Sequence, residues 1–200
     1  MEHLMDQSKE PIETDPKQIH WQEITEKVDR IVDKLNLPVD DGIKESIISL
    51  HAFGFHTTAS CEGHDAHATD APYIDIETEE VEAIEIRLRE LKKKAEGQSE
   101  VIVEQLKAES HEIILELERK NLEERKKIIG YLDEFYKDRE VSYETRLVVQ
   151  GKARGWSRLE SQGTDIQEIR SEEEKKTKLK EYQEEMWAFT EFLKNKYFAE

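Results

Sequence analysis

The feature that most constrains this chain is a long segment, from about Glu79 to Tyr136, that contains no proline and only two glycines. Apolar residues recur within it at steps of three and four, the spacing of a helix with one narrow apolar stripe. They are Val81, Ile84, Leu88, Leu91 and Ala95, followed by Ile102, Leu106, Ile113 and Leu117. The pattern predicts a helical, coiled-coil-like arm over residues 79–139.

Gly97 is the candidate break in this arm. Lys92, Lys93 and Lys94 precede it, where positive charge favours a helix C-terminus, and Ser99 follows at a position suited to cap a new helix. The arm is therefore either two antiparallel helices or one unbroken helix of about 85 Å at 1.5 Å per residue. Because so narrow a stripe does not stabilise an isolated helix, we expect the arm to pack on other helices, most simply in a homodimer.

The composition leaves room for only a small core outside the arm. Of the 200 residues, 36% are apolar and 38% are charged. The net charge of -17 disfavours nucleic acid as a partner, because such binders gain affinity from Lys and Arg. No segment approaches the roughly 18 consecutive apolar residues of a membrane helix, so no membrane partner is expected. A single cysteine and the lack of a signal-like N-terminus predict a cytoplasmic protein.

Two helices are expected at the start of the chain, after a disordered tail over residues 1–17. The first runs from about Ile19 until Pro38 ends it. Its expected stripe comprises Ile24, Val28, Ile31 and Leu35. The second is capped by Asp40 or Asp41 and ends near Gly54, which suits a helix C-cap.

Four short strands follow from alternating polar and apolar residues. Two precede the arm, at residues 55–61 and 72–77, and two follow it, at 146–150 and 156–161. A last helix is expected over 165–197. The predicted class is α+β, a small four-stranded sheet covered by helices, with the arm inserted between the strand pairs. Residues 18–78 and 140–200 together form the predicted head.

The loop after the first strand holds the densest cluster of potential metal ligands. Cys61, His64 and His67 lie around Gly63, which suits a tight turn, and they would fit Zn²⁺ with water or a carboxylate as the fourth ligand. Glu62 lies beside them as a candidate general acid or base. Cys61 could instead act as a nucleophile, or simply fill core space while the two histidines lie in solvent.

The charges around the strands divide into two regions. No Lys or Arg occurs from Glu45 to Ile86, which favours a divalent ion or a cationic partner there. The later hairpin has the opposite charge, because Arg154 and Arg158 lie on either side of Trp156, a combination that would grip an anion or stack on a base. If the hairpin lay beside the first strand, these residues would join Cys61, Glu62 and His64 in a pocket for a small polar ligand.

The segment from Gly54 to His64, followed by Pro72, Tyr73 and Ile74, contains a T-x-x-S-C-E-G-H motif. It resembles a motif of uncharacterised bacterial and phage proteins, a likeness that covers about a tenth of the chain and implies no assigned activity. The shorter Ser-Cys-x-Gly core is also similar to that of proteins of wybutosine synthesis on transfer RNA. P-loop, Rossmann, H-E-x-x-H and G-x-S-x-G patterns are absent from the sequence.

Two functions follow from these observations. The first is a non-catalytic interaction or ligand-binding protein that recognises its protein or small polar ligand at the Cys61–His67 loop and self-associates through the arm. The alternative is a metal-dependent enzyme in which Cys61, His64 and His67 hold the metal and Glu62 is the general acid or base.

Overall fold

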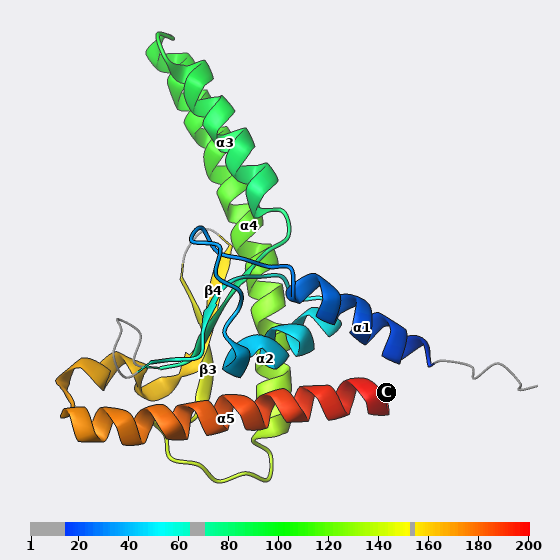
Figure 1. Cartoon of the computed structure of the whole chain (residues 1–200). Coiled ribbons are helices and arrows are strands. Elements are labelled where there is room, and N and C mark those ends of the chain that lie inside the picture. Colours follow the sequence, from blue (N-terminus) through cyan, green and yellow to red (C-terminus); the bar gives the residue numbers. More distant parts are fainter. Residues whose placement is uncertain (1–14, 65–70, 153–154) are drawn as a thin grey trace, which may run out of the picture.

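The computed structural model describes residues 15–64, 71–152 and 155–200. Within these ranges the chain has the expected α+β class, with a small sheet, covering helices and a long helical arm (Figure 1). The helices are α1 (Pro16–Val28), α2 (Asp41–Ala52), α3 (Val81–Ala95), α4 (Glu100–Phe135), the short 3-10 helix η1 (Gln162–Ile169) and α5 (Glu172–Ala199). The strands are β1 (Thr57–Cys61), β2 (Tyr73–Glu77), β3 (Leu147–Gly151) and β4 (Trp156–Ser161).

The four strands form one antiparallel sheet in the order β1-β2-β4-β3. Alternate residues face opposite sides of a sheet, so each strand supplies both faces. The apolar face carries Ile74, Ile76, Leu147 and Leu159, all buried. The opposite, polar face carries Tyr73, Asp75, Arg158 and Glu160. The arm enters between β2 and β3, yet β2 still pairs directly with β4, so the insertion does not interrupt the sheet.

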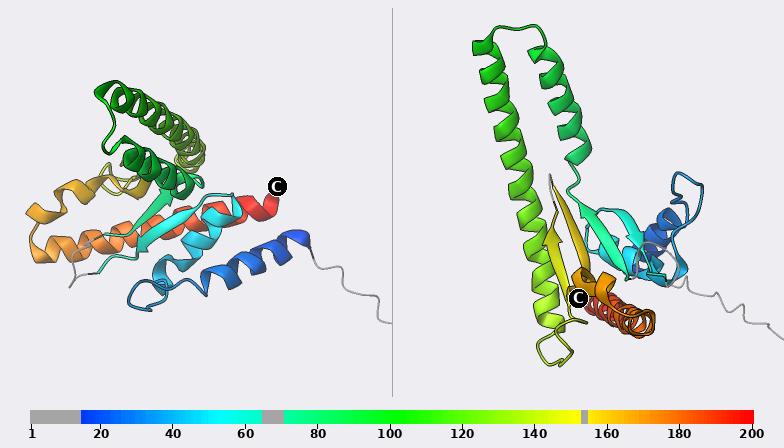
Figure 2. Two further views of the ribbon diagram at one scale, coloured as in Figure 1. Left: turned by 90° about the horizontal axis from the view of Figure 1, so that it is seen from above. Right: turned by 90° about the vertical axis from the view of Figure 1, so that its left-hand side faces the viewer.

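Helices α2 and α5 and the C-terminal half of α4 cover the apolar face (Figures 1 and 2). Their buried residues form one continuous core with the strands, in which Phe135 of α4 and Phe189 of α5 pack edge to face at 5.3 Å. This core holds the N-terminus of α2 against the end of β1, and those two elements build the site described below.

The arm consists of α3 and the N-terminal half of α4, which run antiparallel and extend beyond the sheet (Figure 2). The helical segment is broken at Gly97, whose φ of +74° is readily adopted only by glycine. Val81, Leu91, Ile113 and Leu117 are buried between the two helices. At 36 residues, α4 is about 54 Å long and continues from the arm into the head.

The first helix differs from its prediction at both ends. It begins at Pro16, which the sequence places in the tail, because Asp15 caps it and proline is tolerated at the first helical position. It ends at Val28, well before Pro38, and Ile31 and Leu35 are exposed loop residues instead of members of its stripe. Their helical spacing is coincidental: the Asp33 side chain accepts hydrogen bonds from the N–H groups of Leu35 and Leu37 and closes a loop.

The C-terminal segment is also divided. The expected helix over 165–197 appears as η1 followed by α5, because Ser171 and Glu174 form a capping box that starts a new helix. Among the described residues, no helix has the length and apolar character needed to cross a membrane.

Candidate metal-binding site

Three potential metal ligands meet where β1 ends beside the start of α2. They are Asp40, Cys61 and His64, here called the corner, and their nearest ligand atoms all lie within 4.8 Å of one another. Cys61 is buried, whereas the side chains of Asp40 and His64 are each 36% exposed. The corner therefore offers oxygen, sulfur and nitrogen donors with one side open to solvent.

Asp40 occupies the N-cap position of α2 but makes no side-chain cap to its own helix. Its Oδ2 instead accepts a hydrogen bond from the N–H of Glu62 at 3.3 Å. Glu62 in turn binds the start of α2, where its Oε2 accepts a hydrogen bond from the N–H of Gly42 at 2.7 Å. A carboxylate at a helix N-terminus is stabilised by the unpaired N–H groups there. This exchange ties the loop after β1 to α2 and turns the Asp40 carboxylate toward Cys61 and His64.

Gly63 shapes the turn between Cys61 and His64. Its φ is +82°, and a Cβ atom there would lie 2.6 Å from Leu179 Cδ1 and 2.8 Å from the carbonyl carbon of Ala71, so only glycine fits. Its N–H donates to Cys61 Sγ at 3.3 Å. Gln183 of α5 donates from Nε2 to the carbonyl oxygens of Glu62 and Gly63 at 3.0 and 3.3 Å and holds the turn from the other side.

The imidazole of His64 lies between two carboxylates. Its Nε2 is 3.5 Å from Asp40 Oδ2, and its Nδ1 is 3.9 Å from Glu62 Oε1. In metal sites the histidine nitrogen that does not bind the ion usually faces a carboxylate, a carbonyl or water, which fixes the ring. The two nitrogens of His64 face different carboxylates, Nε2 that of Asp40 and Nδ1 that of Glu62.

Tyr73 borders the corner from the neighbouring strand, since it pairs with Cys61 across the sheet. Burial raises the pKa of Tyr73, the Arg158 guanidinium opposes that rise, and the carboxylates of Asp75 and Asp40 add to it. The phenol therefore stays protonated at neutral pH and can donate a hydrogen bond.

The structure brings together three of the residues singled out in the sequence, Cys61, Glu62 and His64. His67 and Arg154 lie outside the described residues. Trp156 and Arg158 are not part of the corner, because β4 pairs with β2 and not with β1. Each pairs instead with an acid of β2: Trp156 Nε1 donates to Glu77 at 2.6 Å, and Arg158 binds Asp75 through two hydrogen bonds of 2.6 and 2.8 Å.

Arg158 approaches the corner only indirectly. Its guanidinium lies 3.9 Å from the centre of the Tyr73 ring, and Tyr73 in turn borders Cys61. The pocket that would combine the hairpin charges with the Cys61 loop is not formed by these side chains.

Asp40 and Gln183 are the site residues that sequence reasoning missed. Asp40 had a sufficient explanation as a helix cap, and its turn toward Cys61 depends on the tertiary contact with Glu62. Gln183 lies in a largely polar helix with no local feature to mark it. The sequence signal for Asp40 was limited to its place as an acidic residue before α2, the helix that precedes the strand ending at Cys61.

No family model matches the chain, and neither the curated proteins nor the solved structures contain a significant match. The fold and the site define an α+β protein with a helical arm and with potential oxygen, sulfur and nitrogen ligands grouped at a strand end.

Proposed function

We propose that this is a ligand-binding protein whose recognition centre is the corner, and that the corner holds a divalent transition-metal ion, Zn²⁺ being the best match. The observation that carries the proposal is the placement of His64 in the cluster with Asp40 and Cys61, where its Nε2 lies 3.5 Å from Asp40 and its Nδ1 lies 3.9 Å from Glu62. If the contact with Glu62 shortened to a hydrogen bond, it would give the carboxylate–histidine–metal arrangement, in which the outer carboxylate orients the ring.

The donor set favours zinc over the common hard cations. Thiolate and imidazole select zinc and similar ions, whereas Mg²⁺ and Ca²⁺ take oxygen ligands almost exclusively. The N–H of Gly63 on Cys61 Sγ adds an outer-shell hydrogen bond to the sulfur.

Calorimetric titration of chelator-treated, reduced protein with Zn²⁺ tests the proposal. We expect one ion per chain, and at least about tenfold weaker binding in Asp40→Asn, Cys61→Ser and His64→Ala, since even outer-shell changes cost 10- to 100-fold. His56→Ala is the control, because the His56 side chain is 55% exposed and pairs with Glu77, at 4.0 Å, outside the corner. Zinc binding that is absent, or that all four variants retain, would contradict the proposal.

The enzyme alternative is favoured by a separate observation, the open side of the corner. Three protein ligands leave a fourth tetrahedral position, the arrangement of catalytic zinc sites. Glu62 would then be the general acid or base, acting through Oε1, since Oε2 accepts from Gly42. A hydrolytic activity that Glu62→Gln abolishes at a Zn²⁺ concentration that saturates the variant would establish this alternative. An activity unchanged in Glu62→Gln would exclude that role.

Self-association through the arm is the second part of the proposed function. One side of the α3–α4 pair is an open groove of about 370 Å³. Its lining includes Leu91, Ala95, Val103, Leu106 and Ile114. A second copy of the arm would cover these apolar side chains and complete a four-helix bundle.

A further inference from the structure

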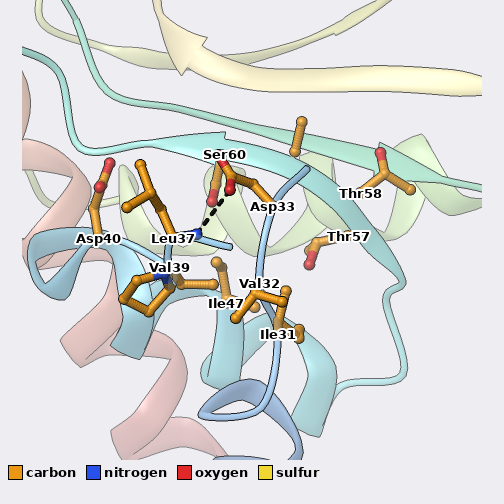
Figure 3. A pocket seen from close by; sticks show the side chains of 12 residues that line it. Ile31, Val32, Asp33, Leu37, Val39, Asp40, Ile47, Thr57, Thr58 and Ser60 are labelled. Carbon is orange, nitrogen blue, oxygen red and sulfur yellow. Dashed lines mark hydrogen bonds between the residues drawn. The ribbon is translucent and has the colours of Figure 1, made fainter. Parts of the chain in front are cut away.

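A groove runs along the outer edge of β1, between that strand and the loop that joins α1 to α2 (Figure 3). It encloses about 330 Å³. One wall is β1 itself, from Thr57 to Ser60, and the other is the loop from Ile31 to Asp40. We call this space the β1 groove.

The β1 wall supplies main-chain hydrogen-bonding groups. In the sheet of the described residues β1 is an edge strand, so it pairs with β2 along one side and borders the groove along the other. An edge strand presents a row of N–H and C=O groups that an extended chain can pair with, and proteins that bind peptides in this way use such an edge together with pockets for alternate side chains.

The loop wall is apolar and preformed. Ile31, Val32 and Leu37 line the groove with 40%, 52% and 56% of their surface exposed, and Ile47 of α2 forms its buried floor. The loop holds its shape through the Asp33 carboxylate, which accepts from two backbone N–H groups, and through a bridge between Val32 and Pro38. Apolar side chains held in fixed positions beside an open strand edge are typical of a binding surface.

The charges of the lining select the occupant. Asp33 and Asp40 lie in the groove, and none of the described residues that line it is Lys or Arg. A second copy of β1, with the sequence Thr-Thr-Ala-Ser over 57–60, would bring no cation to these carboxylates. A segment that alternates apolar and basic side chains would pair with the strand, fill the apolar wall and neutralise both acids.

We propose that the β1 groove binds an extended peptide segment with alternating apolar and basic residues, added to the sheet as a fifth strand beside β1. This peptide site does not depend on a metal at the corner. Because Asp40 belongs to both, one end of the bound peptide would lie against the corner.

Fluorescence anisotropy with a labelled, N-acetylated and C-amidated peptide of alternating valine and lysine tests the proposal. We expect saturable binding, and no binding of the matched valine–glutamate peptide. Val32→Glu and Leu37→Glu should each weaken the affinity by about tenfold or more, the loss expected for a buried aliphatic contact. Leu35→Glu is the matched control, since Leu35 is on the same loop and 78% exposed but does not line the groove; its affinity should stay within about twofold of the wild type.

Strand pairing is tested separately by N-methylation of the peptide. In a strand, alternate N–H groups point toward the neighbour, so methylation of one alternating set should abolish binding and methylation of the other should leave it nearly unchanged. Equal losses of affinity on methylation of either set would show that the peptide does not pair with β1 as a strand.

The remaining outcomes also decide the proposal. Equal binding of the valine–glutamate peptide, or equal losses in Leu35→Glu and Leu37→Glu, would overturn it. So would a failure of the valine–lysine peptide to bind while Val32→Glu changes the mass of the protein in solution, because the groove would then be a contact between copies. Titrations with and without Zn²⁺ keep the result separate from the metal site, since loss of zinc binding in Cys61→Ser should leave peptide affinity intact.

Discussion

Asp40 and His64 face each other across the end of β1, with His64 Nε2 3.5 Å from Asp40 Oδ2. One residue starts α2 and the other follows β1, so an ion bound between them would join a helix to the sheet edge. A ligand that binds only the folded state stabilises it, by about 2.7 kcal/mol at a concentration 100 times Kd. We therefore expect Zn²⁺ to raise the melting temperature of Asp40→Asn clearly less than that of the wild type, whereas Mg²⁺ should raise neither. If Zn²⁺ raised the melting temperature of Asp40→Asn as much as that of the wild type, the ion would bind outside the corner.

Alanine substitutions at Gly63 and Gly54 separate the cost of a side chain at positive φ from the cost of steric crowding. Gly63→Ala adds a Cβ where Leu179 and Ala71 leave no room, at a φ of +82°. Gly54→Ala is the matched control, because Gly54 has a φ of +79° with nothing within 4 Å of a Cβ. We expect Gly54→Ala to cost about 1–2 kcal/mol of unfolding free energy from the backbone conformation alone, and Gly63→Ala to cost more.

Gly63→Ala should also weaken zinc binding, because it displaces the turn that places His64. Gly54→Ala should bind zinc as the wild type does. Chemical denaturation and zinc titration of the two variants measure both effects, and equal behaviour of the two would show that the surroundings of Gly63 can move.

His51 makes the stability depend on pH. Burial lowers the pKa of His51, and the positive charges of His56 and Lys27 lower it further; its Nε2 lies 2.9 Å from Thr57 Oγ1. Below pH 6.5 the unfolded chain takes up a proton at this position before the folded chain does, so acidification favours unfolding. The stabilisation is complete above the unfolded pKa and is lost as pH falls toward the folded pKa, with a slope of at most about 1.4 kcal/mol per pH unit.

His51→Gln should remove this contribution while an amide keeps the contact with Thr57. Urea unfolding at several values between about pH 5 and 8 should give a smaller loss of free energy on acidification for the variant than for the wild type. If the unfolding free energies of the wild type and the variant changed equally with pH, His51 would have the same pKa in the folded and unfolded chains.

Asp75 and Arg158 form an ion pair with two hydrogen bonds on the polar face of the sheet. Asp75 is only 5% exposed, so Arg158→Met would leave a buried carboxylate without its cation. Breaking a fully buried pair costs roughly 3–5 kcal/mol; because 29% of the Arg158 side chain is exposed, we expect about 2–3. Arg87→Met in the arm is the control, since its pair with Glu109 is exposed and should contribute less than about 1 kcal/mol.

Adding Asp75→Asn to Arg158→Met should recover part of the lost stability, because the buried charge is then removed. Denaturant unfolding of the single and double variants provides the comparison. A double variant less stable than Arg158→Met would show that Asp75 contributes through contacts other than its charge.

The strands and the class of fold could be predicted because alternation along a strand is a local property. Ile74 and Ile76 alternate with Tyr73 and Asp75 in the sequence and lie on opposite faces of the sheet. The spacing of Ile31 and Leu35 is also a local pattern, but the helix that it predicts there is wrong. The Asp33 hydrogen bonds and the positive φ of Asn36 form a loop instead.

The corner could be only half predicted for a related reason. Cys61, Glu62 and His64 are close in sequence, so a turn was enough to bring them together. Asp40 joins them only because the core holds α2 beside β1 and because Glu62 caps α2 in its place. A ligand supplied by tertiary packing leaves no local pattern in the sequence.

The arm provides the last prediction, since its open groove should be covered by a second copy. Light scattering at micromolar concentration should then give a mass near twice 23.6 kDa. Leu106→Glu places a charge in the groove and should yield a monomer, because a carboxylate cannot be buried there without a partner. Val101→Glu is the control on the same helix, as Val101 is 69% exposed and does not line the groove, and it should remain dimeric. Circular dichroism of both variants checks that the helices are kept; a wild-type mass of 23.6 kDa at every concentration would disprove the dimer and leave the arm as an intramolecular hairpin.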